Sequence, residues 1–423
     1  MLRRPPPGLT RASTVVLLLL VASPAQPQAP REIVVGPGEA VRTITAAVAQ
    51  ARPGDRVRVR PGTYREPTIL IDRRIELVGE GMPRIDGGGE ERHLIRVIAD
   101  SVVIRGLHLT NAGVSFVRDH AAIEFLDVRG CVAEDNRLED NFFGIYLARA
   151  TGCVVARNVI TASGDREVTS GNGIHLWSSS DAVIENNHIA GQRDGIYLEH
   201  VQGTTIRGNT SEDNLRYGLH FMFSNDNSYV GNAFRRNGAG VAVMYARRVT
   251  IRDNVFEDNW GPAAYGLLLK EIADSRIEGN RFSGNTVALS SEGSQRVHVA
   301  GNRFIRNGWA ARVMANSQEN RFVENDFIEN SFDVTTNSRR NFNVFEGNYW
   351  SRYAGYDLNG DGFGDVPFRP VRLFSMLVER TPLALVLLRS AFVDLLDIAE
   401  RVAPVLTPET LVDERPRIRE VNS

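Results

Sequence analysis

The stretch VTIRDNVFEDN, residues 249–259, contains the unit from which most of this chain is built. Alternating apolar residues lead to Asn254, an apolar ring follows at Phe256, and a second asparagine, Asn259, comes five residues after the first. Most intervals between the first asparagines are 22 or 23 residues, and the two longer ones contain insertions at residues 164–171 and 261–265. A period of this length is typical of a solenoid. The first asparagine recurs at Asn136, Asn158, Asn187, Asn209, Asn232, Asn254, Asn280, Asn302, Asn325 and Asn348.

Each period also contains a third segment of the form G-I-x-L, such as GIYL from Gly195. Apolar residues of period two predict strands, and the asparagine and glycine positions predict tight turns. Three strands per repeat predict an all-β chain folded as a right-handed parallel β-helix, with equivalent residues stacked about 4.8 Å apart. The asparagines are then structural, because their side chains can bond along the rod, and we assign them no catalytic role.

The regions flanking the repeat predict caps for the open ends of the rod. Residues 26–66 are expected to hold a short helix and a first strand, and they resemble the N-terminal cap of pectin-lyase-like β-helices. The coils are expected to span residues 67–354, followed by an Asp/Gly loop at 355–370 and a C-terminal helical tail at 371–423. The apolar surface of residues 382–406 exceeds one helical stripe, which indicates that it caps the rod, docks on a partner, or does both.

The first 25 residues read as a signal peptide, with three arginines before a short apolar run at residues 14–22 and small residues up to Ala25. This predicts export to the periplasm. The 49 basic and 51 acidic residues nearly balance, so the chain lacks the strongly basic footprint of a nucleic-acid-binding protein.

The two cysteines fit the repeat, since Cys131 and Cys153 are 22 residues apart and each lies five residues before a repeat asparagine. They are therefore expected to stack on adjacent coils, at a spacing that a disulfide allows. Directly aligned neighbours make strained bridges, so a disulfide and two free buried thiols both remain open.

Outward positions on the G-I-x-L strands carry a set of soft metal ligands. His220, Met222 and Met244 lie on successive coils, and His175 and Met314 are weaker candidates on the same face. Thioether and imidazole together suit Cu(I) and suit neither calcium nor magnesium. The alternatives are an aromatic and Met-rich docking face, or a column covered by a loop.

A second candidate site lies in GYDLNGDGFGDVPF, which starts at Gly355. The side chains of Asp357, Asn359, Asp361 and Asp365 match positions 1, 3, 5 and 9 of a calcium loop, and Gly362 matches the turn position. The twelfth position is Phe368, so the loop is not an EF-hand. It is either a structural calcium site or a solvated turn.

Taken in order, the blocks YGLHFMFSNDN, VMYARR, AYGLLLKE and GNYWSRYAGYDLNGDGFGDVPF resemble the NosD family along essentially the whole chain. The resemblance implies a periplasmic, non-catalytic maturation factor for nitrous oxide reductase. It also implies an ABC-type permease with its ATPase, a membrane-anchored copper chaperone and the apo-reductase as partners. The C-terminal helices are then expected to seat on the permease, and the His220, Met222 and Met244 column to receive or relay Cu(I).

Two rival functions predict different residues. A polysaccharide lyase, glycosidase or epimerase needs clustered acids and bases. The outward column offers Glu199 and Lys270 with no second carboxylate on neighbouring coils, and Asp194 is expected to satisfy backbone groups at a turn. A purely structural rod leaves the apolar C-terminal helices unexplained.

Overall fold

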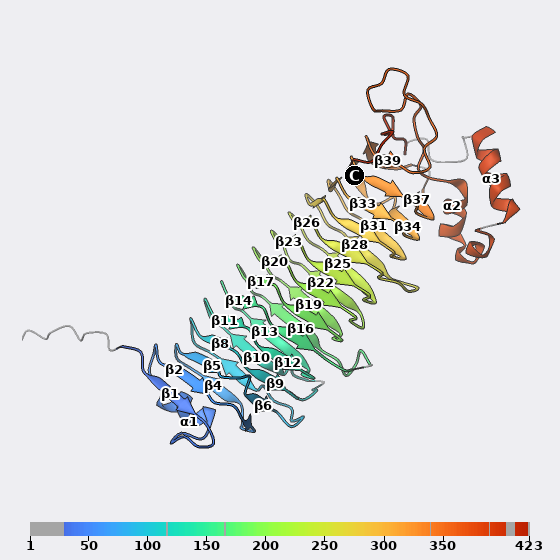
Figure 1. Ribbon diagram of the computed structural model, residues 1–423. Coiled ribbons are helices and arrows are strands. Elements are labelled where there is room, and N and C mark those ends of the chain that lie inside the picture. The colour runs from blue at the N-terminus through green and yellow to red at the C-terminus, as the bar shows by residue number, and fades with distance from the viewer. Residues whose placement is uncertain are drawn as a thin grey trace, which may run out of the picture.

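The computed structural model describes residues 29–115, 117–164, 166–338, 340–388, 390–402 and 411–421. These residues form one long rod of parallel strands, with a short helix at its N-terminal end and further helices at its C-terminal end (Figure 1). The predicted signal peptide lies outside the described residues.

Three parallel sheets run along the rod. The 14-stranded sheet comprises β1 (Glu32–Val35), β2 (Arg56–Val59), β5 (Glu76–Gly79), β8 (Val103–Arg105), β11 (Val132–Glu134), β14 (Val154–Ala156), β17 (Val183–Glu185), β20 (Thr205–Arg207), β23 (Ser228–Val230), β26 (Thr250–Arg252), β29 (Arg276–Glu278), β32 (His298–Ala300), β35 (Gln318–Val323) and β38 (Phe342–Glu346). The 12-stranded sheet comprises β4 (Ile69–Ile71), β7 (Ile95–Val97), β10 (Ala121–Leu126), β13 (Phe143–Ala148), β16 (Asn172–Trp177), β19 (Asp194–Glu199), β22 (Tyr217–Met222), β25 (Ala239–Met244), β28 (Tyr265–Lys270), β31 (Val287–Glu292), β34 (Trp309–Val313) and β37 (Phe332–Thr335). The 13-stranded sheet comprises β3 (Thr63–Tyr64), β6 (Arg84–Asp86), β9 (His108–Thr110), β12 (Arg137–Glu139), β15 (Val159–Thr161), β18 (His188–Ala190), β21 (Thr210–Glu212), β24 (Ala233–Arg235), β27 (Val255–Glu257), β30 (Arg281–Ser283), β33 (Arg303–Ile305), β36 (Asp326–Ile328) and β39 (Tyr349–Trp350).

The predicted parallel β-helix is confirmed, since each coil adds one strand to each sheet. Equivalent residues align, as when Phe256 pairs with Phe282 and Phe282 with Phe304. Their ring centroids lie 4.5 and 4.9 Å apart in stacked pairs. The apolar ring two residues after each asparagine therefore fills the inside of the rod.

The repeat asparagines form a buried ladder from Asn136 to Asn348. At Asn254, the backbone N–H and the side-chain Nδ2 both donate to Oδ1 of Asn280, at 2.9 and 3.0 Å, and Nδ2 also donates to the carbonyl of Tyr229. The residue before each ladder asparagine turns the chain in the left-handed region, as at Asp253 (φ 57°) and Gly279 (φ 65°). A second ladder of the same kind runs from Asn214 to Asn330.

The N-terminal end is covered by the predicted short helix, α1 (Ile44–Gln50). Glu66 holds the start of this helix, because its carboxylate accepts hydrogen bonds from the backbone N–H groups of Ile44 and Thr45 at 2.7 and 2.8 Å. Both β1 and β2 already belong to the 14-stranded sheet, so residues 26–66 contribute strands to the rod as well as a cap.

The C-terminal region contains α2 (Leu373–Arg380), a 3₁₀ segment η1 (Pro382–Leu387) and α3 (Ala391–Val402). Helices thus occupy only part of residues 371–423. The stretch from residue 411 returns to the rod, where Asp413 forms a bridge with Phe345 and Arg417 with Tyr349. The Asp413 carboxylate accepts from the Asn348 side chain at 3.0 Å, and so takes the place of the next asparagine in the ladder.

Both cysteines are free thiols with fully buried side chains. They occupy equivalent positions on adjacent coils, as predicted, and the backbone N–H of Cys131 donates to Sγ of Cys153 at 3.3 Å. The Cys131 thiol donates to the carbonyl of Ala99 at 3.3 Å. Of the two alternatives left open by the sequence, the structure shows the free thiols.

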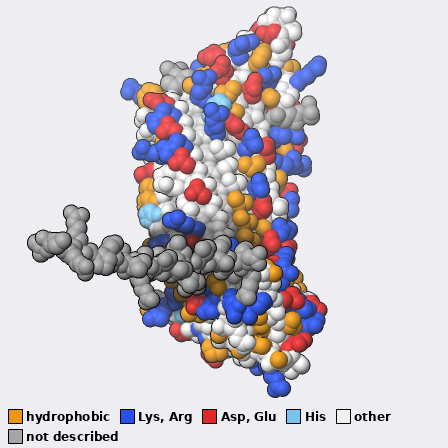
Figure 2. All heavy atoms as spheres, turned by 90° about the vertical axis from the view of Figure 1, so that its left-hand side faces the viewer, with side chains coloured by type: hydrophobic (Ala, Val, Ile, Leu, Met, Phe, Trp, Pro, Cys, Tyr) orange, Lys and Arg blue, Asp and Glu red, His pale blue; other side chains and the backbone are white. Residues whose placement is uncertain are grey.

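Ion pairs connect neighbouring coils on the outside of the rod. On the face shown in Figure 2, basic and acidic side chains lie side by side along the rod. Arg248 pairs with Asp226, and Arg296 with Asp274, each with oxygen–nitrogen distances of 2.6 Å. These pairs are solvent-exposed, so each contributes little to stability.

We expect Asn280→Ala to destabilise the rod strongly. The substitution leaves the buried Asn254 N–H and the Ile251 carbonyl without the side chain that bonds them, at a cost of about 2–4 kcal/mol. Urea unfolding measures this free energy. The exposed Arg281→Ala variant on the same coil is the control, and equal destabilisation by both would contradict the structural role of the ladder.

Candidate functional site

The outer face of the 12-stranded sheet carries two rows of side chains, each set by the strand register. The first row is Leu70, Arg96, Glu124, Tyr146, His175, Tyr197, His220, Ala242, Leu268, Ser290 and Arg312. The second row, two residues further along each strand, includes Ala148, Trp177, Glu199, Met222, Met244, Lys270 and Glu292.

Three of the five predicted soft ligands lie together. Met222 and Met244 are aligned neighbours on β22 and β25. His220 lies two residues before Met222 on β22, so both side chains leave the strand on the same face. Ala242 is the neighbour of His220 on the next coil, and the Tyr217 ring packs against the imidazole with the ring centroids 4.7 Å apart. Both methionines are partly exposed.

The other two predicted ligands lie elsewhere. His175 is two coils before His220, with Tyr197 between them, and so is about 10 Å away along the rod. Met314 follows β34, three coils beyond Met244, with Lys270 and Glu292 between. Neither reaches the cluster formed by His220, Met222 and Met244, which we call the soft-ligand cluster.

His220 is held in an unusual environment. It points away from the rod interior, but only 7% of its surface is exposed, and neither ring nitrogen has a hydrogen-bond partner among the described residues. Its Nδ1 lies 3.7 Å from Oδ2 of Asp194. In many metal-binding histidines one ring nitrogen donates a hydrogen bond to a carboxylate; here the carboxylate lies beside the ring, but the separation is longer than a hydrogen bond.

The sequence analysis expected Asp194 to satisfy backbone groups at a turn, but its carboxylate binds a side chain. Asp194 begins β19, is fully buried, and accepts two hydrogen bonds from the Arg216 guanidinium, one of them at 2.8 Å. Burial is the largest single influence and raises the pKa of Asp194, but the hydrogen bonds and charges of Arg216 and His220 together outweigh it, and the net shift is downward. Asp194 is therefore a buried anion facing His220, and the sequence analysis missed this role.

Aromatic rings of the preceding coils lead along the first row to His220. Tyr146, His175, Tyr197 and His220 form a continuous ladder, with successive ring centroids 4.8, 4.8 and 5.1 Å apart. Burial lowers the pKa of His175 to about 3, so this imidazole is neutral at neutral pH. The sequence signal for the ladder was a Tyr or His at the x position of four successive G-I-x-L-type segments.

A separate stack of exposed rings lies beside the methionines. His200, Phe223 and Tyr245 each follow a second-row residue, and their ring centroids are 5.3 and 5.1 Å apart. Phe223 is 43% exposed and Tyr245 is 37% exposed. Exposed aromatic rings in contact are typical of protein-binding surfaces.

The predicted calcium loop is a turn stabilised by its own side chains. Asp357 accepts from the backbone N–H groups of Gly360 and Gly362, at 2.7 and 2.9 Å, and Asp365 accepts from that of Leu358. Asn359 and Asp361 accept from backbone N–H groups in the same way. Over the described ranges, no group of three or more His, Cys, Asp or Glu side chains is arranged to hold a metal ion. Calcium binding there stays a prediction.

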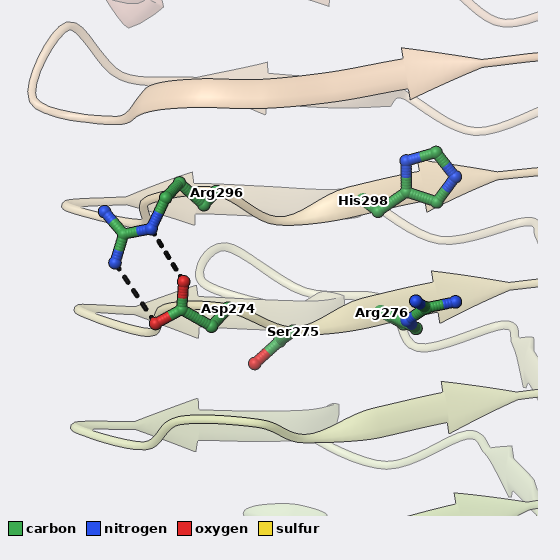
Figure 3. Close-up of a pocket in the computed structure, with 5 residues that line it drawn as sticks. All are labelled: Asp274, Ser275, Arg276, Arg296 and His298. Atoms are coloured by element: carbon green, nitrogen blue, oxygen red, sulfur yellow. Dashed lines mark hydrogen bonds and ion pairs between the residues drawn. The ribbon is translucent and has the colours of Figure 1, made fainter.

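A further hollow of about 410 Å³ lies on the 14-stranded sheet (Figure 3). Arg296 makes two hydrogen bonds to Asp274 at the turns that precede the strands. Arg276 and His298 lie on the two neighbouring strands, β29 and β32. The Asp274 and Arg296 charges neutralise each other in a pair that recurs along the rod. This hollow therefore belongs to the structural ion-pair rows.

The fold and the outer face define a parallel β-helix with imidazole and thioether side chains on one face. Residues 160–355 match the family model described as "Periplasmic copper-binding protein (NosD)". A Pseudomonas aeruginosa protein named "Probable ABC transporter binding protein NosD" is 30% identical over 91% of this chain and 95% of its own. A Stutzerimonas stutzeri protein of the same name is 29% identical over 97% of this chain and 95% of its own. The chain belongs to the NosD family, as the sequence blocks implied.

Solved structures with the same fold are distant in sequence. The catalytic unit of a Streptomyces thermodiastaticus α-1,3-glucanase aligns with a TM-score of 0.58 and 15% identity, over 78% of this chain and 70% of its own. The A-module of the Azotobacter vinelandii mannuronan C-5 epimerase AlgE6 aligns with a TM-score of 0.52 and 17% identity, over 74% and 95%. At these identities the likeness concerns the fold alone.

We expect acid to destabilise the protein partly through His175. The pKa of this histidine is depressed in the folded state, so its stabilising contribution is present above about pH 6.5 and is lost as the pH falls toward 3. In His175→Gln, the loss of unfolding free energy between pH 7 and pH 4 should be smaller by roughly 2–3 kcal/mol. Urea unfolding at both pH values measures this, with the exposed His200→Gln as control. An unchanged pH dependence in His175→Gln would contradict a buried neutral imidazole.

Proposed function

We propose that this chain is a periplasmic, non-catalytic subunit of an ABC transporter, and that it receives and relays Cu(I) for the copper–sulfide centre of nitrous oxide reductase. The observation that carries the proposal is the soft-ligand cluster, in which His220, Met222 and Met244 share one face of two adjacent coils. The copper-binding description of the family supports the choice of metal.

The chemistry of the cluster suits Cu(I). Two thioethers and an imidazole are soft, neutral donors, and Cu(I) accepts low coordination numbers and sulfur ligands. The Asp194 carboxylate next to His220 favours a cation at the ring. Because the methionines are partly exposed, an ion can reach these two side chains from solvent or from another protein.

The proposed partners match surfaces around the cluster. The stack of His200, Phe223 and Tyr245 adjoins Met222 and Met244, and we assign it to docking of the membrane-anchored copper chaperone and of the apo-reductase. Both relatives are named as probable ABC transporter binding proteins, which is why the proposal includes an ABC transporter. Its permease provides the membrane-spanning part of the complex, and its ATPase binds the nucleotide. Within the described residues, no helix is long and apolar enough to cross a membrane.

An anaerobic Cu(I) competition titration tests the relay. We expect stoichiometric binding by the wild type and a loss of affinity of about 100-fold or more in Met222→Ala with Met244→Ala, because two of three ligands are removed. Met314→Ala is the matched control, since this methionine continues the same row three coils away. Absence of binding by the wild type, or equal weakening by Met314→Ala, would overturn the proposal.

The C-terminal helices offer the surface that we assign to the permease. Phe374, Val378 and Val393 pack on Phe332 at the end of the 12-stranded sheet, and Glu379 pairs with Arg312 at 2.6 Å. This anchoring leaves apolar side chains facing outward. The most exposed are Leu383 (84%), Val386 (88%), Leu395 (63%) and Ile398 (58%).

Point substitutions test this docking better than truncation does, because removal of the C-terminus would also take Asp413 from the end of the ladder. We expect Leu383→Asp combined with Val386→Asp and Leu395→Asp to reduce co-purification with the permease and ATPase about tenfold or more, since burial of each side chain is lost. Val117→Asp, an 89% exposed apolar position near the other end, is the control. Full co-purification of the triple variant would exclude this surface.

A further inference from the structure

A groove of about 970 Å³ lies on the outer face of β4, β7, β10 and β13, at the N-terminal end of the first row. It lies before residue 160, where the match to the family model begins. Tyr146 forms its far wall and is also the first ring of the ladder that leads to His220. The groove is therefore on the same face as the soft-ligand cluster but several coils away.

The floor of the groove is a buried acid with a basic partner. Glu124 is only 5% exposed, and its Oε2 lies 2.9 Å from Nε of Arg96 and 3.5 Å from Nε2 of His93. Neither contact has hydrogen-bond geometry, so this oxygen is buried without a hydrogen-bond partner in the described structure. Burial raises the pKa of the Glu124 carboxyl. A polar oxygen in this state favours a ligand that donates a hydrogen bond to it.

Two neutral imidazoles flank the acid. Nδ1 of His93 accepts from the backbone N–H of Ala121 at 3.2 Å, so its proton is on Nε2, toward Glu124. Nδ1 of His120 is buried and has no hydrogen-bond partner in the described structure. Burial lowers the pKa of both rings, that of His93 to about 4. Each ring therefore combines one donor with one acceptor at neutral pH.

The arrangement does not suit a metal ion, because Nδ1 of His93 already accepts a hydrogen bond and no three His, Cys, Asp or Glu side chains converge among the described residues. The lining charges also balance, with three arginines, Arg92, Arg96 and Arg118, and three acids, Glu91, Asp119 and Glu124. A strongly charged ligand finds no net complement here.

Apolar side chains line the remaining side of the groove. Leu70 is 48% exposed and Ile98 is 45% exposed, so both present aliphatic surface to whatever fills the groove. An occupant that matches both sides needs many hydroxyl groups and an apolar C–H face. We infer that the groove binds an uncharged saccharide, with hydroxyls bonded to Glu124, Arg96 and His120 and a ring face packed on Leu70 and Ile98.

Saturation-transfer NMR and calorimetry on the full-length exported protein test this, with cellotetraose, maltotetraose and chitotetraose as probes and an oligogalacturonide as the charged comparison. We expect at least one uncharged probe to bind, and Glu124→Gln to weaken it about tenfold because a hydrogen bond to a charged acceptor is lost. Tyr146→Phe, which keeps the ring, should weaken binding a few-fold. Glu292→Gln, on the same sheet face many coils away, should leave it unchanged.

Three results would overturn the inference: no saturation transfer from any uncharged probe at millimolar concentration, preferential binding of the oligogalacturonide, or equal binding by the wild type and both groove variants. Circular dichroism and thermal unfolding establish that each variant is folded. Cu(I) titration of the same variants separates the two sites, because copper binding at the soft-ligand cluster is expected to be unchanged by Glu124→Gln.

Discussion

The side chain of each ladder asparagine occupies the space between two coils and bonds the buried backbone of the coil before it. At Asn254, the backbone N–H and the side-chain Nδ2 both donate to the Asn280 side chain on the next coil. Nδ2 also donates to the backbone carbonyl of Tyr229 on the preceding coil. No other polar side chain of this length supplies both a donor and an acceptor without a charge. This requirement imposes the same turn on coil after coil, and the chain of side-chain bonds runs from Asn136 to Asp413.

Register has a direct functional consequence, because it decides which side chains are neighbours on the outer face. Met222 and Met244 are 22 residues apart in the chain and adjacent in space only because their strands align without slippage. A slip of one residue would turn both toward the interior. The ladder on one corner of the rod therefore maintains the soft-ligand cluster on another face.

Hydrogen bonding then separates side chains that the sequence pattern treats alike. His175 and His220 occupy equivalent strand positions and are similarly buried, but Nδ1 of His175 is hydrogen-bonded to the Asn172 side chain, whereas neither ring nitrogen of His220 has a hydrogen-bond partner in the described structure. At the N-terminal end of the same row, Glu124 and Arg96 form an ion pair in place of the aromatic rings. One outer face thus carries two different chemical environments, and the helices at the far end carry a third surface.

The sequence by itself determined the fold class, the coil length, the inward rings and the alignment of Met222 with Met244, because each follows from the spacing of residues within a local repeat. It also identified the family through blocks that are contiguous in the chain. Tertiary structure alone decided that Asp194 faces His220 and that Asp413 ends the ladder from 65 residues beyond Asn348. The groove at Glu124 was invisible for the same reason, since its coils depart from the repeat and its lining comes together through burial and insertions, which local spacing does not encode.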